Sequence, residues 1–228
     1  MQKLLKKYEL ELEEHELKRF EKFLEIFMEK NSKINLSAIR DKEWIIEKHF
    51  IDSIMLNVFV ELEWKVADMW TGWGFPLIPL AIINPEVQFT WIDSVGKKLK
   101  AIDEFVEELW LNNVKTLNWR AEEIGQNLEY REQFDYITSR ATAFFPTLLE
   151  YVIPLLKEWG IFCAYKLNDK QELKSAKKAL SRLWAKILKV KNYNLADQER
   201  TIVLIQKISK TNIKYPRKVW IPLASPIK

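Results

Sequence analysis

The chain has 228 residues, of which 48% are hydrophobic and 30% are charged, enough to bury the core of one ordinary domain. One cysteine and two histidines cannot build a disulfide framework or a Cys/His zinc site, so we expect no metal and a reducing, cytoplasmic location. The first 20 residues are too charged for a signal peptide, and no apolar run reaches 18 residues, so neither export nor a membrane span is expected.

The glycine and tryptophan counts are abnormal. The chain has 5 glycines and 10 tryptophans, whereas average usage gives roughly 16 glycines in this length. Glycine is the residue that fits tight turns without strain. A domain with so few glycines needs another explanation for its turns.

The N-terminal residues 1–62 are predicted to form a helical cap. Apolar residues recur near the 3.6-residue helical period over residues 2–30, with a break expected around 14–17. A loop rich in Ser and Asn follows, and a second helix is expected over about 41–59.

Residues 63–228 alternate between short apolar strands and helical stretches. Strands are expected at 65–69, 87–93, 114–118, 134–140 and 160–166, and helices at 75–83, 96–110, 142–156 and about 169–182. This spacing predicts an α/β, doubly wound and mostly parallel sheet. The last two strands, 185–193 and 200–208, have no helix between them and are expected to form an antiparallel hairpin at one sheet edge.

The positive charge is concentrated in the C-terminal third. Residues 160–228 contain 16 Lys and Arg against 4 Asp and Glu, although the net charge of the whole chain is only +4. Such asymmetry indicates a polyanionic partner. Solvated helix and strand faces are the alternative explanation.

The residues after the first predicted strand are typical of a cofactor loop. Gly72 and Gly74 allow close backbone approach at the carboxyl end of this strand, where ligands of such sheets bind. Asp93 ends the second strand about 20 residues later, where a carboxylate can accept both ribose hydroxyls of a cofactor. Asp93 could instead cap the helix that follows.

The third and fourth strands lead to further candidates at the same edge, Arg120, Ala121, Glu122 and Arg140. A carboxylate that binds the ribose, backbone N–H groups near the adenine and an open loop after the first strand suit an adenine-containing cofactor without a pyrophosphate. The loop lacks the G-x-G-x-x-G spacing that seats a pyrophosphate, which disfavours a nucleotide-dependent oxidoreductase.

Several motifs occur together in a recognisable order. The series D-x-W-T-G-W-G-F-P-L-I-P-L, I-D-S-V-G-K-K, R-A-E-E and S-R-A, preceded by I-N-L-S-A-I-R and K-H-F-I-D-S, resembles the RsmG or GidB family of bacterial 16S rRNA guanine-N7 methyltransferases. The resemblance extends from about residue 20 to the C-terminus. It implies a class I S-adenosylmethionine-dependent methyltransferase fold (Rossmann-like) with a helical cap, S-adenosylmethionine as cofactor, 16S rRNA or the small ribosomal subunit as partner, and a monomer.

The resemblance also assigns residues to the site. The cofactor contacts it implies are Trp70, Gly72, Gly74, Phe75, Asp93, Ala121, Glu122 and Arg140. The RNA-facing mouth it implies contains Asn35, His49, Asp52, Arg120, Lys166 and Arg200, and the residues expected to position the substrate are Arg140, Arg120, Lys166, Arg200 and His49. Two alternatives stay open: His49 and Asp52 could lock the cap onto the sheet, and Arg200 could be a strand-edge charge.

The implied reaction needs no general base. Guanine N7 has a free lone pair and no proton at neutral pH, so attack on a sulfonium methyl requires alignment only. Carboxylates and an aromatic ring such as Phe75 can hold a cationic sulfonium, and basic residues can fix phosphates.

Tryptophan replaces glycine at positions where the family has glycine. These positions are Trp64, Trp70, Trp73, Trp110, Trp119, Trp159, Trp184 and Trp220, and at Trp73 the family has mostly Gly or Ala. Trp44 and Trp91 are left as ordinary tryptophans. Repeated replacement of one residue type by one other favours a decoding artefact, in which a UGA codon that means glycine is written as tryptophan. If Trp70 and Trp73 are genuine, their indoles obstruct the cofactor loop, and the alternative function is a catalytically impaired RNA-binding module associated with the ribosome.

Overall fold

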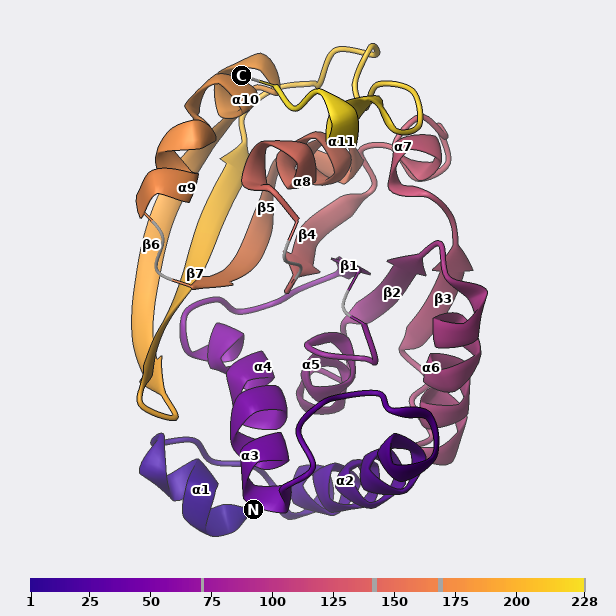
Figure 1. Ribbon diagram of the computed structural model, residues 1–228, viewed down its shortest axis with the longest axis vertical. Helices are drawn as coiled ribbons and strands as arrows, with labels where there is room; N and C mark the ends of the chain where they lie inside the picture. The colour runs from indigo at the N-terminus through magenta and orange to yellow at the C-terminus, as the bar shows by residue number, and fades with distance from the viewer. Residues whose placement is uncertain (71, 141–142, 168–169, 228) are drawn as a thin grey trace.

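The computed structural model describes residues 1–70, 72–140, 143–167 and 170–227, with no side chain described for 167 and 170. Residues 142 and 169, where two of the expected helices begin, lie outside the described residues. Figure 1 shows helices on both sides of a twisted central sheet, with the N-terminal helices at the bottom and the C-terminal segment at the top.

The described residues form a seven-stranded sheet in the order β3-β2-β1-β4-β5-β7-β6. Five strands are parallel: β1 (Lys65–Met69), β2 (Gln88–Asp93), β3 (Val114–Asn118), β4 (Phe134–Ser139) and β5 (Leu156–Leu167). β7 (Gln198–Lys207) is antiparallel to β5 and pairs with the edge strand β6 (Ala185–Leu195). The predicted α/β class, with a parallel sheet and a C-terminal antiparallel hairpin, is confirmed.

The helices on the two sides of the sheet cover two separate cores. One side carries α1 (Gln2–Lys7), α2 (Glu14–Ile34), α3 (Lys42–Ile45), the π-helical η1 (Ile46–Ile51), α4 (Asp52–Ile54), the 3-10 helix η2 (Met55–Val58), α5 (Leu77–Ile83) and α6 (Gly96–Glu108). The other side carries α7 (Ala121–Ile124), α8 (Phe145–Val152), η3 (Ile153–Leu155), α9 (Lys170–Ser175), α10 (Lys177–Arg182) and α11 (Ile221–Ala224). Alternation along β1 divides the strand between them, because Val66 faces the first core whereas Ala67 and Met69 face the second.

Some predicted boundaries were wrong. The N-terminal break falls at residues 8–13 rather than 14–17, because Glu13 and Glu16 form a capping box that starts α2 at Glu14. β5 begins at Leu156, four residues earlier than expected, and the short helices α7 and α11 were not predicted. The continuous helical stretch expected over 41–59 is confirmed as α3, η1, α4 and η2.

The N-terminal helices share their core with the sheet domain. The Phe23 ring lies 5.3 Å from that of Phe75 and 5.2 Å from that of Phe105, between centroids. Aromatic pairs at this separation add packing energy beyond their buried area. These contacts fix the position of α2 relative to α6 and to the segment just before α5, while a domain boundary between residues 62 and 63 stays a prediction.

Buried charges attach the C-terminal segment to the second side of the sheet. Arg217 donates from Nε and Nη2 to the two carboxylate oxygens of Glu150, at 2.8 and 2.7 Å, and the Glu150 residue is fully buried. Arg131 donates to the backbone carbonyls of Thr211, at 2.8 Å, and Tyr215, at 2.7 Å. The chain after β7 is therefore held over α7 and α8.

We predict that Arg217→Ala lowers the free energy of unfolding by about 3 kcal/mol, because it leaves the buried Glu150 carboxylate without its cation. Urea unfolding monitored by circular dichroism measures the change. The control is Lys18→Ala, since the exposed Lys18–Glu14 pair contributes little to stability. Equal small effects of the two substitutions would contradict the prediction.

Candidate active site

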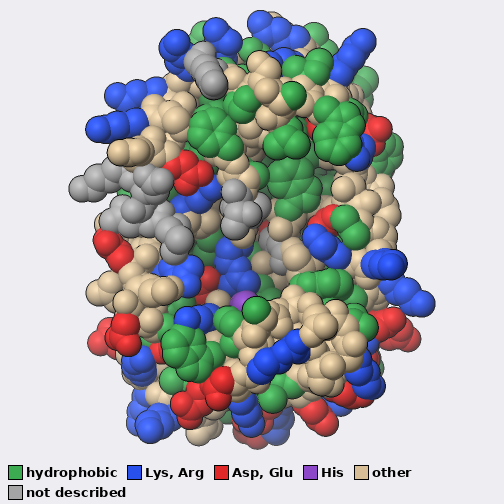
Figure 2. Space-filling model, in the orientation of Figure 1, with side chains coloured by type: hydrophobic (Ala, Val, Ile, Leu, Met, Phe, Trp, Pro, Cys, Tyr) green, Lys and Arg blue, Asp and Glu red, His purple; other side chains and the backbone are tan. Residues whose placement is uncertain are grey.

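The predicted site residues gather where the parallel strands end. Trp70 directly follows β1, Asp93 ends β2, Arg120 lies two residues after the end of β3, and Arg140 directly follows β4. Because the carboxyl ends of parallel strands lie at one edge of a sheet, these residues border the crevice in which ligands of such folds bind. Figure 2 shows a hollow in the middle of the molecule, with Lys, Arg and His side chains gathered in its lower part.

Asp93 has the geometry of a buried acceptor rather than a helix cap. Its side chain is 2% exposed; Oδ1 accepts from the Val95 amide at 2.9 Å, and Oδ2 lies 3.2 Å from Lys98 Nζ. The N-cap of α6 is Val95, with no side-chain capping bond. The carboxylate keeps further lone pairs for a ligand.

A small cavity lies beside Glu122. It has a volume of about 150 Å³ and is lined by Trp70, Arg120, Glu122, Tyr151 and Trp220, among others. Glu122 Oε1 accepts from the Tyr151 hydroxyl at 3.2 Å and from the Trp220 amide at 3.1 Å. Burial and the nearby Glu122 raise the pKa of Tyr151, so the phenol stays a donor.

The first loop combines two glycines with an indole. Gly72 (φ 65°) and Gly74 (φ 94°) have left-handed backbone, and a Cβ on Gly74 would come within 2.6 Å of Ile78 Cδ1. Trp70 also has positive φ, 60°, and its ring meets the Tyr151 ring edge-on at 5.0 Å between centroids. The loop is therefore shaped for glycine at three positions and has tryptophan at one of them.

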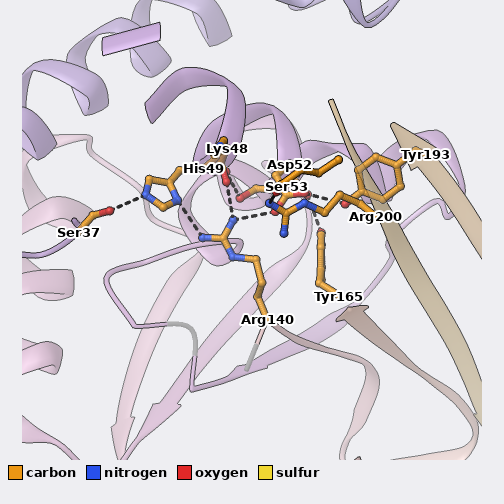
Figure 3. A network of polar contacts seen from close by, with 10 residues as sticks. Ser37, Lys48, His49, Asp52, Ser53, Arg140, Tyr165, Tyr193 and Arg200 are labelled. Atoms are coloured by element: carbon orange, nitrogen blue, oxygen red, sulfur yellow. Dashed lines mark hydrogen bonds and ion pairs between the residues drawn. The ribbon is translucent and has the colours of Figure 1, made fainter. Parts of the chain in front are cut away.

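Arg140 joins the sheet to the N-terminal helices (Figure 3). Its Nη1 donates to Asp52 Oδ2 at 3.0 Å and to the Lys48 carbonyl at 3.2 Å, and Nη2 lies 3.3 Å from His49 Nδ1. Asp52 Oδ1 also accepts from the Tyr193 hydroxyl at 2.7 Å. His49 and Asp52 were alternatively expected to lock the cap onto the sheet. They do so through Arg140, which follows β4 and contacts both side chains.

His49 is held in its neutral form. Because Arg140 can only donate, His49 Nδ1 accepts, and Nε2 lies 2.9 Å from Ser37 Oγ. Burial and the charge of Arg140 lower the pKa of His49 to about 3. The imidazole stacks on Phe75 at 4.9 Å between centroids, and Phe75 is itself 3% exposed. Contact of Phe75 with a cofactor stays a prediction.

The other basic candidates fall into separate groups. Lys166 donates to Glu172 Oε1 at 2.8 Å and to the Ala143 carbonyl at 3.2 Å. In the β5–β7 register Lys166 opposes Thr201, and Arg200 opposes residue 167, so Lys166 and Arg200 point to opposite faces of the sheet. Arg120 lies with Glu122 and Trp220, with its guanidinium 4.4 Å from the Trp220 ring centroid. Asn35 is the left-handed C-cap of α2.

Four residues of this region were not identified from the sequence. They are Ser37, Tyr151, Tyr165 and Tyr193, which bind His49, Glu122, the Ser53 carbonyl and Asp52 respectively. Each lies far along the chain from at least one of its partners or has no distinctive spacing. Ser37 lies within the I-N-L-S-A-I-R motif, but no local pattern reveals which partners these four residues bind.

The ranges covered by the structure hold no group of three His, Cys, Asp or Glu residues that could bind a metal ion. Within the same part of the chain, no helix is both long and apolar enough to cross a membrane.

The sheet order and the acidic residue at the end of β2 define the class I S-adenosylmethionine-dependent methyltransferase fold. Solved structures agree: a SAM-dependent methyltransferase from Aquifex aeolicus has a TM-score of 0.56 at 18% identity, covering 79% of this chain and 98% of that one. TrmK of M. capricolum, solved with S-adenosyl-homocysteine, has a TM-score of 0.54 at 16% identity, covering 75% of this chain and 73% of that one.

The family follows from sequence comparison. The GidB model, described as rRNA small subunit methyltransferase G, matches residues 16–203. Proteins named ribosomal RNA small subunit methyltransferase G are 40% identical in Lactococcus lactis subsp. lactis, over 98% of this chain and 96% of that protein, and 42% identical in Desulfitobacterium hafniense, over 96% and 92%. The chain belongs to the GidB family of methyltransferases.

We predict that His49 makes stability fall with acid. The folded-state pKa of His49, about 3, lies below its ordinary value of about 6.5, so the unfolded chain takes up a proton first. The stability that the folded protein has with a neutral His49 is fully present above pH 6.5. It is lost as the pH falls from 6.5 toward 3, by at most about 1.4 kcal/mol of unfolding free energy per pH unit.

Denaturant unfolding between pH 7 and pH 5 measures the slope in the unmodified chain, in His49→Gln and in His15→Gln. We expect a shallower slope for His49→Gln only, because His15 is exposed. Parallel slopes in all three proteins would contradict the prediction.

Proposed function

We propose that this protein transfers a methyl group from S-adenosylmethionine to N7 of a guanine in small-subunit (16S) ribosomal RNA. The observation that carries the proposal is membership of a family described as rRNA small subunit methyltransferase G, matched over residues 16–203. The absence of a proton on guanine N7 removes the need for a general base, so the site has to supply alignment.

Part of the site fits the cofactor. The buried Asp93 carboxylate suits the ribose hydroxyls of such a cofactor. Ala121 and Glu122, which follow the third strand at the same edge of the sheet, are proposed to contact the adenine. Bound S-adenosylmethionine would supply the methyl group on a sulfonium. The cavity beside Trp70 and Glu122, of about 150 Å³, is smaller than the 300–1,000 Å³ of typical small-molecule sites.

The RNA is proposed to reach the site across the basic residues of the mouth. Arg120, Arg140, Lys166 and Arg200 stand at or near the carboxyl ends of β3, β4 and β5 and at the start of β7, and the Lys and Arg surplus of residues 160–228 would add phosphate contacts. We propose a monomer that acts in the cytoplasm. A catalytically impaired RNA-binding module would require Trp70 and Trp73 to belong to the functional chain, and family membership does not favour it.

The assay uses small ribosomal subunits from a strain that lacks the methylation, with S-adenosylmethionine labelled in the methyl group. Both the chain as written and its Trp70→Gly/Trp220→Gly variant are tested, and the RNA is digested and analysed by mass spectrometry. We expect N7-methylguanine in the RNA from at least one of them. No product from either would refute the proposed function.

We predict that Asp93→Asn weakens cofactor binding by about 10- to 100-fold, because it replaces charge-assisted hydrogen bonds to the ribose with neutral ones. The Kd for S-adenosylhomocysteine, measured by calorimetry in the Trp70→Gly/Trp220→Gly background, tests this. Asp103→Asn is the control, since the exposed Asp103 on α6 bonds only Thr116 among the contacts described. An unchanged Kd in Asp93→Asn would remove Asp93 from the site.

A further inference from the structure

Tryptophan is concentrated at positions with left-handed backbone. Among the described residues, eleven non-glycine residues have positive φ, and six of them are tryptophans, Trp64, Trp70, Trp110, Trp159, Trp184 and Trp220, with φ between 51° and 71°. With 10 tryptophans in 228 residues, an even spread would put fewer than one at these eleven positions. Left-handed backbone strains residues with a Cβ, and a bulky side chain there is an outlier.

The hydrogen bonds around Trp110 identify a glycine position. The Trp110 amide donates to the Glu107 carbonyl at 3.1 Å, and the Leu111 amide donates to the Val106 carbonyl at 3.0 Å. This is the Schellman motif that ends many helices, and its left-handed C′ residue, here Trp110, is usually glycine. Trp110 is 80% exposed, so no packing of the indole compensates for the strain.

The position after α10 has one of these two hydrogen bonds, the one donated by the left-handed residue. Trp184 follows the C-cap Leu183 with φ 55°, and its amide donates to the Ser181 carbonyl at 3.4 Å. Trp64, Trp159 and Trp220 are likewise more than half exposed. At five of the six positions, the backbone therefore favours glycine and the indole is more than half exposed. Of these five, Trp220 also has a described ring contact, with the Arg120 guanidinium 4.4 Å from its ring centroid.

Two other tryptophans provide a contrast. Trp91 is fully buried within β2, and Trp44 lies in α3 with Lys48 Nζ 3.6 Å from its ring centroid. Both have ordinary backbone for their elements and make contacts that use the indole. Trp73 and Trp119 do not have positive φ, so the inference is confined to the six.

Two of the six indoles occupy the candidate cofactor site. Trp70 and Trp220 both line the cavity beside Glu122, and Trp70 packs edge-on against Tyr151. Glycine at both positions would keep the observed backbone and remove both indoles, which would enlarge the cavity next to the acidic residues.

We infer that the functional form of this protein has glycine at positions 64, 70, 110, 159, 184 and 220. Glycine at 70 and 220 opens the cavity beside Glu122, and this opened cavity is the cofactor cleft. The first part rests on backbone geometry and on the exposure of the indoles, and it is independent of the proposed function. The second part rests on the proposed function, because it takes the cleft to be the site of a nucleoside cofactor.

The coding DNA tests the first part. We expect TGA (UGA in the messenger RNA) at the six positions and TGG (UGG) at positions 44 and 91, the pattern produced when a glycine codon is written as tryptophan. Masses of tryptic peptides from the protein isolated from its own cells should then show glycine at the six positions. TGG in the DNA at any of the six, or tryptophan in these peptides, overturns the inference for that position.

The unfolding equilibrium tests the same point on the protein. We expect Trp110→Gly to raise the folding equilibrium constant about fivefold, because it removes the strain of a left-handed tryptophan. The matched control, Trp44→Gly in α3, should lower it, because glycine weakens a helix. A loss of stability in Trp110→Gly would overturn the geometric argument.

Cofactor binding tests the second part. Calorimetric titration with S-adenosylhomocysteine should show at least tenfold tighter binding to Trp70→Gly/Trp220→Gly than to the chain as written, with no gain in Trp44→Gly. Equal binding by all three would overturn the opening of the cleft. A failure of the ribosomal assay with a gain in binding would count against the RNA substrate and leave this inference standing.

Discussion

The parallel pairing of β1 with β2 and β4 is the constraint on which the site depends. Val66, Ala67 and Asp68 of β1 are each in register with β2 on one side and β4 on the other. Parallel pairing ends neighbouring strands at one edge, so Trp70, Asp93 and Arg140 come together although they are distant in sequence. The same sheet separates two helical layers, one on each of its sides. The junction of these two layers lies at the carboxyl ends of the strands.

Arg140 binds residues of the N-terminal helices at that junction. Its guanidinium satisfies the buried Asp52 carboxylate and the Nδ1 atom of a neutral His49, and Tyr193 of the edge hairpin satisfies the other Asp52 oxygen. A buried carboxylate is costly without such partners. The N-terminal helices, the fourth strand and the C-terminal hairpin are thus tied to one another beside the ligand edge, and a residue expected to position substrate also holds the site together.

The low glycine count and the high tryptophan count are related to the left-handed backbone positions of the fold. Five glycines could not supply all the left-handed positions that this fold uses, and six of those positions carry tryptophan. Turn and cap conformations are set by the hydrogen bonds of the elements around them, as at Trp110, so the fold keeps them even when the side chain opposes them. Where such a position is on the surface the cost is strain, and at Trp70 the indole also lines the cavity beside Glu122.

The sequence by itself determined the class of fold, the parallel strands with their edge hairpin, and the place of Asp93, because hydrophobic periodicity and strand–loop–helix spacing are local. It also singled out all six left-handed tryptophans through the family pattern. Only the tertiary structure decided that Lys166 and Arg200 point to opposite faces of the sheet, that Arg140 binds Asp52 and His49, and that Tyr151 and Trp220 border the cavity. These relations join residues up to 150 positions apart, as Trp70 and Trp220 are in the cavity. They follow from register, burial and charge compensation, which no local pattern encodes.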